Sequence, residues 1–251
     1  MISYWGDSIS APRSCNFVAF TDKATLEFKT TEPATIVYTT DGSDPNLNSS
    51  VYENALTFTE NTTLKLRSVL LSGKMSPIRT ITIEKQTYAP AVEKAEGTQP
   101  GLKTEYYKGV CRTVAELNGK TPDETEQVAA PHFSKYRVMN YSEIYNEDFT
   151  STVLTGYLNI PEDGIYYFST DSELWLDDKL LISNEKDNEG TARRFSRSDK
   201  SIALAKGYHA IKIVRLGATF GGWPTQWEDV TVSMRKTGEP EFRLLNGEDF
   251  K

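Results

Sequence analysis

Hydrophobic and polar residues alternate through the first 88 residues of the chain. Pairs of apolar residues two positions apart recur along this stretch, at Leu26 and Phe28, Ile36 and Tyr38, Leu56 and Phe58, Leu64 and Leu66, and Ile81 and Ile83. A period of two, interrupted by Pro, Gly, Asn and Asp, is typical of strands that bury one face, and threonine suits the solvated face. Several short strands of this kind, which follow one another about 8–12 residues apart, favour a β-sandwich over residues 1–88.

A polar stretch containing proline and glycine follows at residues 89–100, and we predict a linker there. Alternation resumes beyond it, in the segments VLTGYLNIP, GIYYFSTD, ELWLDDKLLI, KSIALAKG, HAIKIVRL and DVTVSM. These segments predict a second β module over residues 101–238, with a tail at 239–251. Residues 119–150 and 183–200 are charged and irregular, and we expect loops there. The pattern therefore predicts an all-β chain of two tandem sandwich modules.

The composition of the 251-residue chain argues against several function classes. Lys and Arg total 28 against 35 Asp and Glu, and this net charge of −7 argues against nucleic acid or an anionic membrane as the partner. Because no run of eighteen apolar residues occurs, we expect no membrane insertion. Cys15 and Cys111 are too few for a disulfide framework, and we expect two unpaired thiols, with a bridge between them as the alternative. His132 and His209 provide little for a zinc site or Ser-His-Asp catalysis.

The first module contains a turn of distinctive composition. Residues 38–45 read Tyr-Thr-Thr-Asp-Gly-Ser-Asp-Pro, and Tyr52 and a TTLKL strand follow. This pattern, over roughly residues 16–84, resembles the chitobiase/β-hexosaminidase C-terminal domain. The resemblance implies a small immunoglobulin-like sandwich without catalytic residues, located behind the catalytic barrel of a glycoside hydrolase. Asp41 and Asp44 are accordingly interpreted as turn residues.

The second module carries a second set of landmarks. They are GLKTEYY from residue 101, GYLNIPEDGIYYF at 156–168, LWLDDKLLI at 174–182 and LAKGYHAI at 204–211. Their order resembles the protective-antigen insert (PA fourteen) domain. The resemblance implies an antiparallel β-sandwich or barrel, and in some members a sugar site built on calcium that a tandem Asp holds.

The sequence departs from that family at the calcium position. Where the tandem Asp would fall, the chain reads Ser169-Thr170-Asp171-Ser172-Glu173, so only Asp171 remains. Calcium takes six to eight oxygen ligands, and this segment supplies few. We therefore expect no cofactor, with calcium at Asp171 as the alternative.

The chain has little equipment for glycoside hydrolysis. That reaction needs two carboxylates facing each other across a sugar pocket. The only adjacent Asp-Glu pair, Asp123-Glu124, follows Thr121-Pro122 in a segment we interpret as a polar loop. We expect this chain to be no enzyme.

The two resemblances together imply the C-terminal, non-catalytic modules of a secreted bacterial glycoside hydrolase, similar to a β-N-acetylhexosaminidase. The expected partners are glycan and a catalytic domain of the same parent chain. The expected location is the periplasm, the cell surface or the medium, with an export signal missing from the sequence because it belongs to the parent. A lectin-like adhesion segment and a self-sufficient hydrolase are the alternatives.

A glycine-rich segment of the second module is the candidate sugar site. It places Phe220, Trp223 and Trp227 between two strands, with Gln226 beside them. Indole offers a flat apolar surface to the C–H face of a pyranose. We predict that these residues, with Asp171, bind carbohydrate; the alternative is that the rings cap the sandwich or pack against another domain. Trp175, in an alternating strand, is assigned to the core.

Overall fold

The computed structural model describes residues 5–7, 16–30, 33–133, 149–183, 198–220, 223–224 and 229–251. The chain forms two compact units, Met1–Tyr88 with Thr237–Pro240, and Ala89–Lys236 with Glu241–Lys251. Strands make up nearly all the regular structure of the described residues, so the expected all-β class is confirmed. No helix among the residues described is long and apolar enough to cross a membrane.

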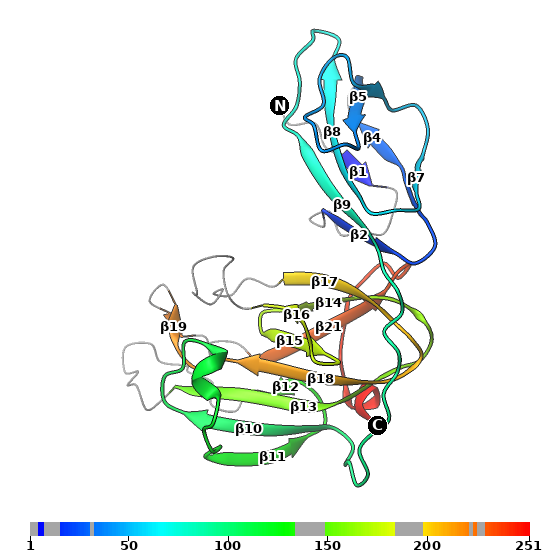
Figure 1. The fold of residues 1–251 in the computed structure, drawn as a ribbon. Coiled ribbons are helices and arrows are strands. Elements are labelled where there is room, and N and C mark those ends of the chain that lie inside the picture. Colours follow the sequence, from blue (N-terminus) through cyan, green and yellow to red (C-terminus); the bar gives the residue numbers. More distant parts are fainter. Residues whose placement is uncertain are drawn as a thin grey trace. The chain divides into compact units, whose positions relative to one another are not determined.

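The first unit is built on a five-stranded sheet in the order β2-β9-β8-β5-β6, with two further two-stranded sheets, β3-β7 and β1-β4 (Figure 1). Strands β2 and β9 pair in parallel, and the other pairs are antiparallel. The strand bounds are β1 Trp5–Asp7, β2 Phe17–Phe20, β3 Ala24–Leu26, β4 Phe28–Thr30, β5 Ala34–Thr39, β6 Ser50–Val51, β7 Leu56–Phe58, β8 Thr62–Leu70 and β9 Arg79–Lys85.

The apolar residues of the alternating pattern form the core of this unit. The buried cluster comprises Val18, Phe20, Ala24, Leu26, Phe28, Ile36, Leu64, Leu66, Ile81 and Ile83. In β8, for example, Leu64 and Leu66 are buried while the residues between and beside them are more exposed. Burial of one face by a period-two pattern is the physical basis of the first module.

The aspartates of the YTTDGSDP segment are turn residues in the structure. Oδ1 of Asp41 accepts hydrogen bonds from the backbone N–H of Ser43 at 3.0 Å and from its hydroxyl at 2.6 Å. The Nζ of Lys65 lies 2.7 Å from Oδ1 of Asp44. Hydrogen bonds from Ser43 lower the pKa of Asp41, and the hydrogen bond and charge of Lys65 lower the pKa of Asp44.

The second unit is built on two large antiparallel sheets, with a further two-stranded sheet, β19-β20 (Figure 1). The first has the order β11-β10-β13-β18-β15-β16, with bounds Glu124–Val128, Leu102–Lys108, Thr150–Ile160, Gly207–Arg215, Glu173–Leu176 and Lys179–Ile182. The second has the order β12-β21-β14-β17, with bounds His132–Phe133, Val230–Lys236, Gly164–Thr170 and Ser198–Leu204, and β22 (Arg243–Leu244) pairs with β21.

Side chains of both sheets pack into one core. The six-stranded sheet contributes Leu102, Leu154, Leu158, Ile160, Leu174, Leu176, Ile182, Ile211 and Ile213. The other sheet contributes Tyr166, Phe168, Ile202, Leu204, Val230, Val232 and Met234. The two facing sheets therefore form a sandwich, the architecture expected for the second module.

Strand β11 lies within the stretch interpreted as irregular loop, so that interpretation is wrong for its residues. Its sequence, ETEQV, has no apolar residue before Val128, which is why hydrophobic alternation did not reveal it. It pairs with β10 along its whole length, with Leu102 opposite Val128 and Tyr106 opposite Glu124. Backbone pairing to an existing strand, rather than burial of side chains, defines this edge strand.

Residues 89–100 begin with a segment that pairs with the second unit. The backbone N–H of Ala89 donates to the carbonyl of Ala203 at 2.9 Å, and that of Val92 donates to the carbonyl of Tyr208 at 2.8 Å. A segment expected to be a linker therefore extends both sheets of the second unit, by isolated bridges to β17 and β18.

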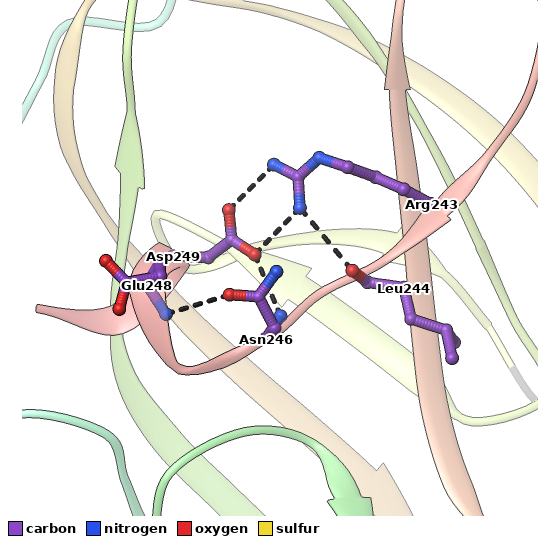
Figure 2. A network of polar contacts seen from close by, with 5 residues as sticks. All are labelled: Arg243, Leu244, Asn246, Glu248 and Asp249. Atoms are coloured by element: carbon purple, nitrogen blue, oxygen red, sulfur yellow. Dashed lines mark hydrogen bonds and ion pairs between the residues drawn. The ribbon is translucent and has the colours of Figure 1, made fainter.

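The C-terminal residues, expected to be a tail, fold back onto the second unit in a similar way. Arg243 holds both carboxylate oxygens of Asp249, at 2.7 and 2.8 Å, as Figure 2 shows. Asn246 caps the short 3-10 helix η5 (Gly247–Phe250) by accepting from the N–H of Glu248 at 2.9 Å. Phe250 then enters the main core with 1% of its surface exposed.

Candidate functional site

A row of polar and aromatic side chains crosses the six-stranded sheet of the second unit. The residues Gln127, Lys103, Thr155, Lys212 and Trp175 are register partners on the successive strands β11, β10, β13, β18 and β15. Their neighbours in sequence belong to the sandwich core, among them Leu102, Leu154, Leu174, Ile211 and Ile213. Because side chains alternate between the faces of a sheet, the row lies on the outer face.

Part of this outer face is already covered. A second cluster packs there, made of Tyr107, Cys111, Leu117, Val153, Val214 and Leu216. Leu117 comes from the short 3-10 helix η1 (Val114–Leu117), and Val153 and Val214 lie two residues from Thr155 and Lys212 in their strands. The cluster therefore covers the outer face of the sheet on one side of the row, but it does not cover the row itself.

Beside the cluster lies a groove of about 770 Å³. It is lined by Thr98, Gln99, Gly101, Lys103, Gln127, Thr155, Gly156, Tyr157, Trp175, Asp178, Ala210, Ile211 and Lys212. Gly101 is required where the chain enters β10, because its φ is +90° and a Cβ there would lie 2.3 Å from the carbonyl oxygen of Val128. The lining is mostly polar or small, with one large aromatic ring besides Tyr157.

Trp175 is held in a fixed orientation within the groove. Its indole Nε1–H donates to Oε1 of Glu173 at 2.6 Å, and Glu173 is itself buried. The Nζ of Lys212 lies 5.7 Å from the ring centroid, within the range of a cation–π contact. The ring is half-buried, so the assignment of Trp175 to the core is wrong. Trp175 differs in parity from the core residues Leu174 and Leu176, and this signal could have placed it on the outer face.

The hairpin that carries Trp175 turns at Asp177 and Asp178, whose φ angles are +48° and +61°. Asp177 fastens the turn to β18: Oδ1 accepts from the N–H of Ala210 at 2.8 Å, and Oδ2 lies 2.6 Å from Nδ1 of His209. The other ring nitrogen of His209 lies 2.8 Å from the carbonyl oxygen of Ala205. His209 is therefore a buried structural residue, and Asp178 extends into the lining of the groove.

Three other polar residues at the groove, Lys103, Gln127 and Tyr157, have intramolecular partners. The Nζ of Lys103 lies 2.6 Å from Oε1 of Glu105. The side-chain amide of Gln127 donates to the carbonyl oxygen of Pro100 at 2.8 Å, and the hydroxyl of Tyr157 accepts from the N–H of Ala95 at 3.2 Å. Asp178 is the only acidic residue among the described residues that line the groove.

Most of the site proposed from the sequence lies where the structure gives no side chains. Gln226 and Trp227 are outside the described residues, and Phe220 and Trp223 pair between the two-residue strands β19 (Thr219–Phe220) and β20 (Trp223–Pro224) without described side chains. Asp171, which follows β14, is described and is partly buried.

Asp171 lies close enough to a buried arginine to affect its ionisation. Burial lowers the pKa of Arg215 to about 10, while the negative charges of Asp171 and Asp229 favour the guanidinium and oppose that shift. Within the described part of the chain, no group of three or more His, Cys, Asp or Glu side chains could hold a metal ion.

In the adjacent acidic pair Asp123-Glu124, Asp123 makes hydrogen bonds to the backbone of β10, and Glu124 is part of β11. Oδ2 of Asp123 accepts from the backbone N–H of Lys108 at 2.7 Å, and its own N–H donates to the carbonyl of Tyr106 at 2.8 Å. Glu124 begins β11 opposite Tyr106. Of the two cysteines, Cys111 is a buried free thiol, and Cys15 is outside the described residues.

Comparison with known families matches both halves of the chain. The family model of the chitobiase/beta-hexosaminidase C-terminal domain matches residues 18–80, and that of the PA14 domain matches residues 98–239. A beta-hexosaminidase from Porphyromonas gingivalis W83 is 39% identical in an alignment of 249 residues that covers 94% of this chain. The chain spans about 30% of the length of that relative.

Solved structures resemble the chain more distantly. The PA14 domain of the MpAFP antifreeze protein has a TM-score of 0.45 at 16% identity, covering 64% of this chain and 95% of that one. A PA14 sugar-binding domain from an RTX adhesin has a TM-score of 0.43 at 14% identity, covering 61% of this chain and 99% of that one.

Proposed function

Since the chain belongs to the PA14 domain family, we propose that it is a non-catalytic accessory part of an extracellular glycoside hydrolase and holds that enzyme on glycan. The parent enzyme acts on glycans that contain N-acetylhexosamine. It works in the periplasm, at the cell surface or in the medium. The partners of the chain are the glycan and the catalytic domain of the parent.

One observation carries this proposal. The match to the Porphyromonas gingivalis beta-hexosaminidase runs through 249 residues, and so includes both the chitobiase-type and the PA14 module. Because these modules make up only 30% of that relative, most of its length is left for other domains. That proportion supports an accessory role beside a catalytic domain.

The chemistry of the groove supports binding rather than hydrolysis. Glycoside hydrolysis requires one carboxyl group as acid and a second as base or nucleophile. Near the groove, Glu173 accepts from Trp175, Glu105 pairs with Lys103, and Asp177 fastens the hairpin. Among the described residues that line the groove, Asp178 then remains as a single carboxylate, which cannot fill both roles.

We retain the glycine-rich loop as a proposed sugar site, formed by Trp223 and Trp227 with Phe220, Gln226 and Asp171. Two indole rings on a loop offer stacking surfaces at a low cost in side-chain entropy. We propose no cofactor for this site, because Asp171 alone supplies few of the six to eight oxygen ligands that calcium takes.

The test uses the chain alone. We expect it to bind chito-oligosaccharides or immobilised chitin, and to release no chromophore from an aryl N-acetyl-β-glucosaminide above the buffer rate. Asp123→Asn and Glu124→Gln serve as controls, because they remove the charges of the adjacent acidic pair. Turnover by the native chain that both variants abolish would show the chain to be an enzyme and overturn the proposal.

A further inference from the structure

We propose that the groove on the outer face of the six-stranded sheet binds a neutral oligosaccharide segment across Lys103, Thr155, Lys212 and Trp175, independently of the glycine-rich loop. The inference rests on the proposed function for the choice of glycan over other neutral polar ligands. The position of the site and the charge of its ligand are argued from the groove itself.

Two charged groups of opposite sign line the groove without an ion-pair partner. Among the described residues, the ammonium of Lys212 contacts only the ring of Trp175, and the carboxylate of Asp178 has no hydrogen bond or ion pair. An anionic ligand would be repelled by Asp178 and a cationic one by Lys212. A neutral polyol avoids both repulsions, since each hydroxyl can donate to a carboxylate and accept from an ammonium.

The hydroxyl of Thr155 adds a further group between the two lysines of the row. Thr155 is opposite Lys103 on one side and Lys212 on the other, and its hydroxyl has no hydrogen-bond partner in the described part of the chain. A hydroxyl both donates and accepts, so it suits either orientation of a sugar hydroxyl. The row therefore presents charge-assisted and neutral hydrogen-bonding groups side by side.

Trp175 supplies the apolar part of the site. Glu173 already accepts from its indole N–H, so the ring offers its surface rather than its hydrogen-bond donor. A large aromatic surface of this kind matches the apolar C–H face of a pyranose. The Nζ of Lys212 lies over the ring at 5.7 Å from its centroid, so a sugar that packs on the rest of the ring surface would have its hydroxyls close to the ammonium.

The dimensions of the groove favour an oligosaccharide over a single sugar. The row from Lys103 to Trp175 crosses β10, β13, β18 and β15, and strands about 4.8 Å apart place its ends about 14 Å from each other. The volume of about 770 Å³ lies in the range of small-molecule sites. Most of the lining residues are polar or small, and such a lining offers little to the large hydrophobic side chains that usually anchor a peptide.

The experiment titrates the whole chain with three probes of matched length and different charge: neutral chitotetraose, its cationic deacetylated form, and anionic tetragalacturonate. We expect chitotetraose to bind best, and Trp175→Ala to weaken it by about tenfold or more. Trp175→Phe retains part of the affinity because it keeps an aromatic ring. Lys212→Ala weakens binding by several fold, whereas Lys179→Ala, a matched exposed lysine on β16 outside the groove, leaves it unchanged.

Asp178→Asn tests the charge argument separately. Asparagine tolerates the positive φ of this turn, so the hairpin is preserved. We expect chitotetraose to bind about threefold to tenfold more weakly and tetragalacturonate to bind more tightly than to the native chain. Circular dichroism and the Tm of each variant verify that it is folded.

The outcomes separate this inference from the proposed function. If the native chain binds chitotetraose and the folded Trp175→Ala and Lys212→Ala variants bind it equally well, the groove is not the site and only this inference fails. If that binding is lost in Trp223→Ala or Trp227→Ala instead, the glycine-rich loop is the site. If the native chain binds no glycan, the glycan-holding role fails together with the inference.

Discussion

Asp177 shows at the scale of one residue how the hairpin beneath the groove is held. Its carboxylate contacts the N–H of Ala210 and the ring of His209, and its backbone N–H donates to the carbonyl of Ala210. His209 is fully buried, so its ring depends on protein groups for its polar contacts. The same turn places Asp178 in the groove, and the position of a candidate ligand contact therefore depends on a structural neighbour.

Asp177→Ala should destabilise the second unit by about 2–4 kcal/mol, because it removes both side-chain contacts and leaves a buried polar ring without one of its partners. Asp178→Asn, at the exposed neighbouring position, should change the free energy of unfolding by less than about 0.5 kcal/mol. Urea denaturation of both variants measures the difference. Equal, small effects would mean that Asp177 does not fasten the hairpin.

The carboxyl groups of Asp41 and Asp44 should titrate below their ordinary pKa of 3.8. A folded-state pKa below the unfolded value stabilises the fold above the unfolded pKa, and that contribution is lost as the pH falls through the folded pKa. Carboxyl-carbon NMR can follow each group. Ser43→Ala should raise the pKa of Asp41, and Lys65→Ala should raise that of Asp44 much more than that of Asp41. No change in either variant would contradict the assigned causes.

Calcium should not stabilise the chain, because Ser169-Thr170-Asp171-Ser172-Glu173 lacks the tandem Asp and supplies few of the six to eight oxygens that calcium takes. A ligand that binds only the folded state raises its stability with concentration. Weak extracellular calcium sites have a Kd of about 10⁻⁴–10⁻³ M. We expect the same Tm in 5 mM EDTA and in calcium at roughly ten to a hundred times that Kd. A clear rise in Tm that Asp171→Asn abolishes would restore the calcium alternative.

At the scale of an element, the mostly polar C-terminal segment contributes one residue, Phe250, to the core of the second unit. Arg243 and Asn246 fix η5 through Asp249 and Glu248 (Figure 2), and this geometry brings Phe250 into the sandwich. The polar residues thus orient one buried ring. Strand β22 adds two backbone pairings to β21 on the way.

Phe250→Ala should lower the free energy of unfolding of the second unit by about 3–5 kcal/mol, the range for removing a fully buried phenylalanine. Leu244→Ala is the matched control, since Leu244 is 47% exposed in the same segment. Its effect should stay within about 0.5 kcal/mol. Thermal unfolding followed by near-ultraviolet circular dichroism compares them, and a Phe250→Ala protein as stable as the control would exclude the segment from the core.

Hydrophobic alternation predicted the elements that mainly bury one face, such as β8, β18 and β21, because burial of one face imposes a period of two. It could not reveal β11, which is held by backbone pairing at a sheet edge and is polar throughout most of its length. It also missed the role of Phe250, since a single apolar residue has no period. The alternation around Trp175 does contain a signal for the groove. Leu174 and Leu176 point into the core, so Trp175, which lies between them in the strand, points to the outer face.

The whole molecule combines two cores that share no residue, one in each unit. Its two family matches follow the same order along the chain, as expected from the sequence. Each core is a cluster of buried apolar side chains, and removal of such side chains from water stabilises the fold. In the second unit, the groove lies on the outer face of the six-stranded sheet, beside the part that the cluster of Tyr107, Cys111, Leu117, Val153, Val214 and Leu216 covers.

The central claim, that the second unit holds glycan on this groove, is tested most directly by the indole N–H resonance of Trp175 in a ¹H–¹⁵N spectrum. The chain has four tryptophans, and the resonance is assigned by its loss in Trp175→Phe. On titration with chitotetraose we predict a saturable shift of this resonance. A sugar on the ring changes the environment of the indole N–H, which donates to Glu173. A Trp175 resonance that stays unchanged while saturating chitotetraose is added would contradict the claim.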